Sequence, residues 1–260
     1  MENASSSFFL NVTSWTMPPA REACQTARRA GGRPDQACYS RSHPRARRAL
    51  LRGVFITFEG VEGSGKTTQA RALKTWLEQH GRAVCLTREP DGTPLGAAVR
   101  ALFEADLARP APLAEAFLFL AARHQHVAQV IRPALERGEV VVSDRFADAT
   151  VAYQGYGRGG DVATIRQLNL LATGGLAPHL TVLLDLPAKT GIGRIAGRAH
   201  DSFEKLGLAF HEQMREGYLE IAREEKERVA VVAADQSADD VQAAIRAAVE
   251  ARLPGARRDR

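Results

Sequence analysis

Residues 54–67 read VFITFEGVEGSGKT. The apolar run Val54–Phe58 predicts a buried strand, and Gly60–Thr67 after it match the pattern G-x-x-x-x-G-K-[ST]. Glycines let successive backbone N–H groups turn towards phosphate oxygens, and the start of a following helix adds a partial positive charge. A strand, this loop and a helix in that order predict a phosphate-binding loop for ATP or GTP.

The chemistry of such a loop assigns roles to its residues. Lys66 is expected to reach the β- and γ-phosphates, and the Thr67 hydroxyl is expected to ligate Mg²⁺. Asp144 directly follows a later apolar run, where a carboxylate at the strand end can hold the same ion. The residues expected to contact ATP are Gly60, Glu62, Gly63, Ser64, Gly65, Lys66, Thr67 and Thr68.

Beyond this loop, short apolar runs alternate with longer amphipathic segments, as in βαβ units. We expect strands at Val54–Phe58, Ala83–Thr87, Val140–Ser143, Thr181–Leu184 and Val229–Ala233. We expect helices at Lys66–Gln79, Leu95–Phe103, Leu113–Glu136, Val162–Thr173, Lys189–Arg198, Leu206–Arg228 and Ala238–Arg252. Strands that are apolar on both faces predict an α/β fold with a five-stranded parallel sheet and helices on both faces. Residues 53–253 are thus expected to form one P-loop kinase domain.

The first 52 residues differ in composition from the rest. They contain nine arginines, no lysine and three acidic residues, and they show no sustained periodicity. We expect this segment to be largely disordered. Two interpretations stay open, a transit peptide and upstream sequence included by an over-long start assignment. Residues 254–260 are expected to be a basic tail.

The net charge of +5 belongs to this N-terminal segment, because residues 53–260 contain 26 basic and 27 acidic side chains. A nearly neutral domain gives no electrostatic reason to expect a nucleic-acid partner. The most apolar stretch, Ala111–Ala122, already contains Glu115, so no membrane partner is expected.

Three cysteines, an odd number, suit a reducing compartment. We expect a cytoplasmic protein, with organellar targeting by residues 1–52 left open.

Other residues bear on the acceptor. Residues 185–189 read DLPAK, where a GTPase would carry the guanine-reading N-K-x-D motif, so no signal for guanine is present. Several arginines are expected at the carboxyl ends of the strands, which suits an acceptor that itself carries phosphate. The arginines that stand out are Arg88 and Arg145 at strand ends, Arg123 inside a long predicted helix, Arg158 in a glycine-rich loop, and Arg194 and Arg198 after the fourth strand.

Four ordered blocks of the chain resemble the thymidylate kinase family. They are residues 55–60 with the phosphate-binding loop, residues 87–96 (TREPDGTPLG), residues 119–123 (FLAAR), and residues 144–146 with 152–159 (DRF and AYQGYGRG). The resemblance spans about residues 54–252. It implies transfer of the γ-phosphate of ATP to dTMP, with Mg²⁺ as the cofactor.

The resemblance also implies roles at the base. Phe119 would stack on the thymine ring, although the residue pattern alone suggests core packing for it. Arg123 would hydrogen-bond the carbonyl edge of the base, which suits a guanidinium donor. Gln154 would lie near the base, and Tyr153 would sit beside C2′ and disfavour ribonucleotides.

At the phosphate, the resemblance implies that Arg88 and Arg145 hold dTMP. Glu62 would lie near the sugar 3′-hydroxyl and the acceptor phosphate. Residues Gly193–Glu204 would form a mobile lid that brings Arg194 and Arg198 to the transferring group. The loop stretch VEGS contains no arginine, so the chain resembles the branch of the family in which the catalytic arginine lies in the lid.

One departure from the family keeps alternatives open. The lid normally ends in Asp-Arg, whereas this chain has Asp201 followed by Ser202. A nucleotide-binding protein with little turnover, or a P-loop kinase with another nucleoside monophosphate acceptor, would also fit. The predicted catalytic residues are Lys66, Arg145, Arg194 and Arg198. The resemblance further implies a homodimer, formed through long apolar helices such as Leu113–Glu136.

Overall fold

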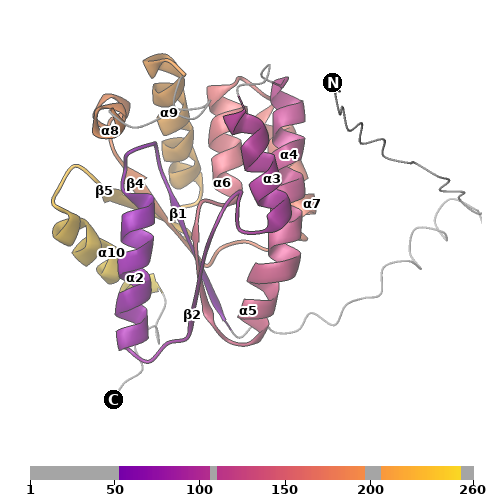
Figure 1. Cartoon of the computed structure of the whole chain (residues 1–260). Coiled ribbons are helices and arrows are strands. Elements are labelled where there is room, and N and C mark those ends of the chain that lie inside the picture. Colours follow the sequence, from indigo (N-terminus) through magenta and orange to yellow (C-terminus); the bar gives the residue numbers. More distant parts are fainter. Residues whose placement is uncertain (1–52, 106–109, 197–205, 253–260) are drawn as a thin grey trace, which may run out of the picture. The chain divides into compact units, whose positions relative to one another are not determined.

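The computed structural model describes residues 53–105, 110–196 and 206–252 (Figure 1). All three ranges lie in one compact unit that spans Ala49–Arg260. The predicted N-terminal segment 1–52, the tail 254–260, Arg198 and most of the predicted lid lie outside the described residues.

A parallel sheet forms the centre of this unit. Its strands are β1 (Val54–Glu59), β2 (Val84–Arg88), β3 (Val140–Asp144), β4 (Leu180–Asp185) and β5 (Val229–Ala233). Their order is β2-β3-β1-β4-β5, and every neighbouring pair is parallel. The five-stranded parallel sheet predicted from the apolar runs is thus confirmed. Because the strands are parallel, the carboxyl ends of β1 and β3 and the loop that follows β1 lie at one edge of the sheet.

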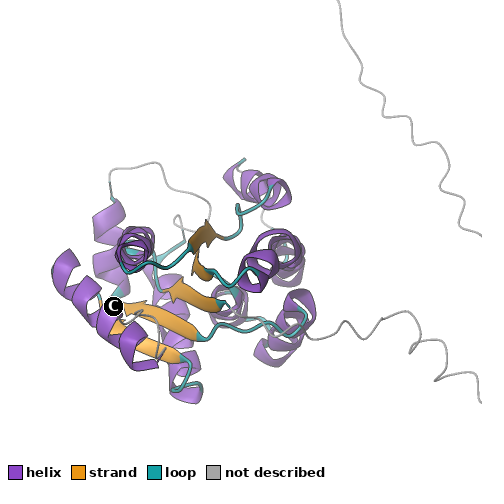
Figure 2. Cartoon of the chain, turned by 90° about the horizontal axis from the view of Figure 1, so that it is seen from below, coloured by secondary structure: helices purple, strands orange, loops and turns teal. Residues whose placement is uncertain are grey.

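Helices pack on both faces of the sheet (Figure 2). Helix α2 (Lys66–Gln79) contacts β1, β2 and β3, and α10 (Ala238–Arg252) contacts β4, β5 and α2. Helix α5 (Arg132–Glu136) contacts β3, whereas α9 (Leu208–Glu224) contacts β4 and β5. The remaining helices are α3 (Pro94–Glu104), α4 (Pro112–His126), α6 (Ala147–Thr150), α7 (Val162–Thr173) and α8 (Ala188–Ile195). In the part of the chain that the structure describes, no helix combines the length and apolar character needed to cross a bilayer.

Local chemistry sets the ends of several helices. Gly65, with φ 92°, precedes α2, and the Asp161 carboxylate accepts hydrogen bonds from the backbone N–H groups of Ala163 and Thr164 at the start of α7. Helix α7 ends at Gly174 in the left-handed conformation. Both helices have the bounds that the sequence predicts.

Helices α8 and α9 end at Ile195 and Glu224, short of the predicted ends, and two other helical regions differ more. The segment predicted as one helix, Leu113–Glu136, contains a π-helical turn, η2 (Val127–Ile131), just before Pro133. Proline has no N–H to donate to the preceding turn, so the regular ladder is interrupted there. Residues 147–157 form α6 and a second π-helical stretch, η3 (Val151–Gly157), where no helix was predicted. Gly155 and Gly157 lower the intrinsic helix propensity of this stretch, and its packing against α9 compensates.

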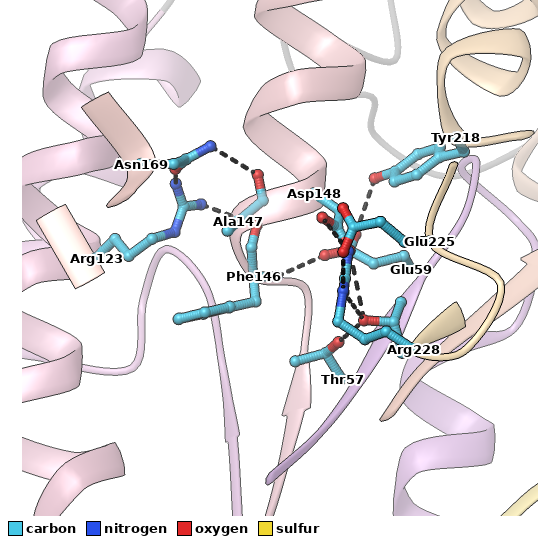
Figure 3. Close-up of polar contacts among 11 residues, drawn as sticks. Thr57, Glu59, Arg123, Phe146, Ala147, Asp148, Asn169, Tyr218, Glu225 and Arg228 are labelled. Atoms are coloured by element: carbon cyan, nitrogen blue, oxygen red, sulfur yellow. Dashed lines mark hydrogen bonds and ion pairs between the residues drawn. The ribbon is translucent and has the colours of Figure 1, made fainter. Parts of the chain in front are cut away.

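A partly buried polar network lies beside the paired strands β1 and β4 (Figure 3). Arg228, just before β5, donates two hydrogen bonds to the Asp148 carboxylate at 2.8 and 3.0 Å. It also donates to the Thr181 hydroxyl at 2.6 Å, which lies 2.7 Å from the Thr57 hydroxyl. The network therefore joins α6 to β1, β4 and the start of β5.

Glu59 lies beside this network and is fully buried at the end of β1. Its carboxyl oxygens accept hydrogen bonds from the Phe146 N–H at 2.7 Å and the Tyr218 hydroxyl at 2.9 Å (Figure 3). Burial and the negative charge of Asp148 raise the pKa of Glu59 to about 8, against the opposing charge of Arg145. Glu59 thereby ties the strand before the phosphate-binding loop to the segment that follows β3.

Candidate functional site

A cavity of about 470 Å³ opens at the carboxyl edge of β1, β2 and β3. Ligands in open α/β sheets bind at this edge. The residues that line it include Glu62, Gly63, Gly65, Lys66, Thr67, Thr68, Arg88, Glu89, Phe103, Phe119, Arg123, Asp144, Arg145, Thr150, Tyr153, Gln154 and Arg194. Most of the residues singled out in the sequence are thus brought together.

The phosphate-binding loop has the backbone that its glycines permit. Gly60, Gly63 and Gly65 have φ angles of 139°, 71° and 92°, which other residues adopt only with strain. A Cβ on Gly63 would lie 2.2 Å from the carbonyl oxygen of Gly191 in α8, so the loop and this helix touch through their backbones. The loop leads into the N-terminus of α2, where unpaired N–H groups favour an anion.

Lys66 is folded onto its own loop. Its ammonium donates hydrogen bonds to the carbonyl oxygens of Gly60 at 2.9 Å and Val61 at 2.7 Å, and to the Ser64 hydroxyl at 3.3 Å. Burial and the nearby charge of Arg145 lower the pKa of Lys66 to about 8, although Glu62 acts in the opposite direction. Gly60 and Ser64 thus bond Lys66, and neither is among the residues that line the cavity.

Thr67 and Asp144 form a pair of oxygen groups at the cavity wall. The Thr67 hydroxyl donates to Asp144 Oδ2 at 2.5 Å. A hydroxyl and a carboxylate side by side are ligands that Mg²⁺ takes, since this ion uses one or two protein oxygens together with phosphate oxygens and water. The residues present fit a magnesium ion. Among the described residues, no cluster of three or more His, Cys, Asp or Glu could hold a metal by itself.

Arg145 is the centre of a buried charged cluster. Its φ of 71° lies in the left-handed region, and its N–H donates to the Phe58 carbonyl at 2.9 Å. Its guanidinium donates to the Tyr153 hydroxyl at 2.6 Å and to Glu62 Oε1 at 3.1 Å. Tyr153 also donates to Glu62. The strained backbone thus directs a cation to the point where the loop meets η3.

Glu62 has a further partner that the sequence did not indicate. His211 Nδ1, from α9, lies 3.2 Å from Glu62 Oε2, and both side chains are buried. Burial by itself raises the pKa of Glu62, but the nearby His211 ring, Arg145 and Lys66 outweigh it and hold this pKa well below its usual range. Glu62 is therefore an anion that accepts hydrogen bonds from Arg145 and Tyr153 and lies beside His211.

Two aromatic rings lie at the other end of the cavity. Phe103 of α3 and Phe119 of α4 stack with centroids 4.9 Å apart and planes 8° from parallel. Phe119 is half-buried and lines the cavity, as a ring that stacks on a base must. One face of Phe119 is covered by Phe103.

Arg123 is buried, and all its N–H groups have acceptors. Nε donates to Glu89 Oε2 at 2.9 Å, and Nη1 donates to Thr150 at 2.8 Å and to Asn169 at 2.7 Å. Nη2 donates to the Phe146 carbonyl at 2.9 Å and lies 2.8 Å from Glu89 Oε2. Figure 3 shows Arg123 between Asn169 and the segment 146–147. A base carbonyl can be bonded by Arg123 only if one N–H is shared or exchanged.

The remaining predicted site residues that the structure describes are Gln154, Arg88 and Arg194. Gln154 donates its amide N–H to the carboxylate of Glu115 at 2.8 Å. The Arg88 side chain is about half exposed and pairs with Asp91. Arg194 donates to the Ala234 carbonyl at 3.0 Å and lines the cavity. Arg198 lies outside the described residues.

The sequence profile of the thymidylate kinase family matches residues 58–245 of this chain. The chain belongs to the thymidylate kinase family. It is 49% identical over 209 residues to the thymidylate kinase of Geotalea uraniireducens, covering 77% of this chain and 98% of that one. The thymidylate kinase of Nitratidesulfovibrio vulgaris is 52% identical over 198 residues, covering 72% and 88% of the two chains.

A solved structure gives the same result for the fold. The crystal structure of thymidylate kinase from Ehrlichia chaffeensis superposes with a TM-score of 0.63 at 33% identity, covering 76% of this chain and 98% of that chain. The sequence resemblance to the thymidylate kinase family is thus confirmed, and the P-loop kinase fold with it.

Proposed function

We infer that the protein phosphorylates dTMP to dTDP with ATP as the donor. This conclusion rests on family membership, because about half of the aligned residues are identical to those of thymidylate kinases over most of the chain. The cavity described above is the site of the reaction, because it joins a phosphate-binding loop to an aromatic, arginine-rich end that suits a nucleoside monophosphate.

ATP lies with its phosphates on the loop and the N-terminus of α2. Lys66 leaves the carbonyls of Gly60 and Val61 and takes the β- and γ-phosphates as partners, which Gly63, Gly65 and Thr68 approach through their backbones. Thr67 and Asp144 are the residues that would hold Mg²⁺. When bound, the ion neutralises charge on the transferring phosphoryl group.

The acceptor lies across the cavity from ATP. Thymine stacks on the ring of Phe119, with Gln154 at its edge and Arg123 near a carbonyl. Tyr153 stands beside the sugar, and Glu62 lies near the 3′-hydroxyl and the acceptor phosphate. Arg88 and Arg145 hold that phosphate, for which a guanidinium fork is well suited.

The reaction needs no general base, because the attacking oxygen of dTMP is already anionic. The residues of the site position the two phosphates in line and neutralise their charges. Arg194, which already contacts the loop side of the cavity, and Arg198 act from a lid over Gly193–Glu204. This assigns the protein to the lid-arginine branch of the family.

A coupled ADP-release assay with ATP, Mg²⁺ and a panel of nucleoside monophosphates tests this proposal. We expect turnover with dTMP in preference to dCMP, dGMP and dAMP, and loss of turnover in Lys66→Ala. Lys74→Ala, a control on the exposed side of the same helix, should leave turnover unchanged. Binding of dTMP without turnover would instead identify a nucleotide-binding protein, and preference for another monophosphate would overturn the acceptor.

The homodimer is a further part of the proposal. Helices α4 and α7 are in contact and present large exposed apolar side chains. These are Leu113, Phe117, Leu170 and Leu171. A surface of this kind on neighbouring helices suits burial against a second copy. Sedimentation equilibrium should give a dimer mass for the wild type and a monomer mass for Phe117→Glu; a dimer that persists in this variant would place the interface elsewhere.

Two proposals concern the chain as a whole. The activity resides in residues 53–253, since the family profile matches residues 58–245 within this range. The protein works in the cytoplasm, which the odd number of cysteines in the chain supports.

A further inference from the structure

The amide of Gln154 is held by a buried hydrogen bond. Its Nε2 donates to Glu115 Oε1 at 2.8 Å, and both residues are only 2% exposed. Gln154 comes from η3 and Glu115 from the first turn of α4, so the bond joins two elements that each contribute residues to the cavity lining.

The charge of Glu115 determines which end of the amide faces it. Arg158 Nη2 lies 3.8 Å from Glu115 Oε2 and donates to the Pro110 carbonyl at 3.0 Å, which places a cation beside the carboxylate. A carboxylate only accepts hydrogen bonds, so Gln154 has to present its NH₂ group to Glu115. The carbonyl oxygen of Gln154 is consequently turned the other way. Within the described residues, the structure gives this amide no other hydrogen bond.

Gln154 and the base-stacking ring of Phe119 face the same cavity. Phe119 lies one helical turn after Glu115 on α4, and both Phe119 and Gln154 line the cavity. In the position proposed above, with Gln154 at the edge of the base, that edge faces a hydrogen-bond acceptor. Thymine carries an N3–H donor on that edge, between two carbonyls. Cytosine carries a lone pair at N3, which an acceptor repels.

We propose that Glu115 is a positioning residue that sets the pyrimidine preference of the enzyme. By holding the Gln154 amide with its carbonyl oxygen towards the base, it selects bases with an N3–H and disfavours cytosine. Glu115 does not touch the substrate and acts through Gln154. The inference rests on the position proposed above for dTMP.

The test compares kcat/KM of the full chain for dTMP, dUMP and dCMP in the wild type and in Glu115→Gln. Glutamine has the same shape as glutamate but can donate as well as accept, so the Gln154 amide is free to turn over. We expect the dTMP to dCMP ratio to fall by about ten-fold, the effect of one hydrogen bond at a buried polar edge. The dTMP to dUMP ratio should not change, because both bases carry N3–H.

A second background separates positioning from structure. In Gln154→Met, which removes both ends of the amide, adding Glu115→Gln should leave the dTMP to dCMP ratio unchanged. Equilibrium dialysis with dTMP and dCMP gives the ratio of the two dissociation constants without turnover. It is used for each variant whose thermal unfolding midpoint equals that of the wild type. An unchanged ratio in folded Glu115→Gln, or equal losses for all three substrates, would overturn the inference.

These outcomes are distinct from failure of the proposed function. If Phe119→Ala left the KM for dTMP unchanged, the position proposed for the base would be wrong, whatever Glu115→Gln does. If Phe119→Ala raised that KM while Glu115→Gln left the ratio intact, only the role of Glu115 would be refuted.

Discussion

Binding of ATP to the phosphate-binding loop should take up a proton from solvent at alkaline pH. In the free protein the pKa of Lys66 is about 8, so at pH 9 only about a tenth of the molecules carry the charge. When ATP binds, phosphate oxygens replace the carbonyls of Gly60 and Val61 as partners of the ammonium, and their negative charge raises its pKa to its ordinary value or above. Uptake should therefore be about 0.9 proton at pH 9 and about 0.1 proton at pH 7.

Isothermal titration calorimetry measures this uptake directly. ATP with Mg²⁺ is titrated into the full chain at pH 9 in two buffers that differ in ionisation enthalpy, and the difference in observed heat gives the number of protons. The ATP phosphates are fully ionised at this pH and contribute nothing. Lys66→Arg is the matched control, because arginine stays charged and should take up no proton.

The same linkage fixes how the affinity depends on pH. Above pH 8 the dissociation constant for ATP should rise by up to about ten-fold per pH unit in the wild type, and it should stay nearly flat in Lys66→Arg. Uptake near zero in the wild type at pH 9, or equal uptake in the two proteins, would show that Lys66 is already charged in the free loop and would refute the argument.

Three further predictions concern stability and the loop. Glu59 has a pKa of about 8 when folded and near 4.5 when unfolded, so stability should fall as the pH rises from 4.5 through 8, and Glu59→Gln should lose most of this dependence in thermal unfolding between pH 6 and 9. Gly191→Ala would place a Cβ 2.2 Å from the Glu62 carbonyl and should raise the KM for ATP, whereas Gly193→Ala, which meets nothing within 4 Å, should not. Phe55→Ala, at a fully buried position, should cost about 3–5 kcal/mol in urea unfolding, and a loss below 1 kcal/mol would contradict its place in the core.

Sequence was sufficient wherever the local chemistry of a few neighbouring residues determines the structure. The glycines before Lys66 fix where α2 begins, and Asp161 and Gly174 fix both ends of α7. The strands were predictable for the same reason, since short runs that are apolar throughout have few alternatives in a chain with a P-loop. The resemblance to the family then supplied roles for residues that no local pattern could assign.

The features that sequence did not reveal depend on partners far away in the chain. The helix at residues 147–157 forms in spite of its glycines because α9 packs on it. The partners of Arg123 come from three separate segments, so its saturation by Glu89 and Asn169 could be seen only in the folded chain. The proximity of His211 to Glu62 likewise joins residues more than a hundred positions apart, and no spacing rule connects them.

The partly buried ion pair of Arg228 and Asp148 has a consequence for how the wall of the cavity can open. Asp148 lies in α6, immediately before the helical segment that carries Tyr153 and Gln154. To swing that segment away from the sheet, the chain would have to break a partly buried ion pair that includes two hydrogen bonds, which is unfavourable. Amide protons of this segment should thus exchange with solvent more slowly than those of a surface helix without such an anchor. Substrates consequently enter past a wall that stays in place, and adjustment to their size has to come from other sides of the cavity.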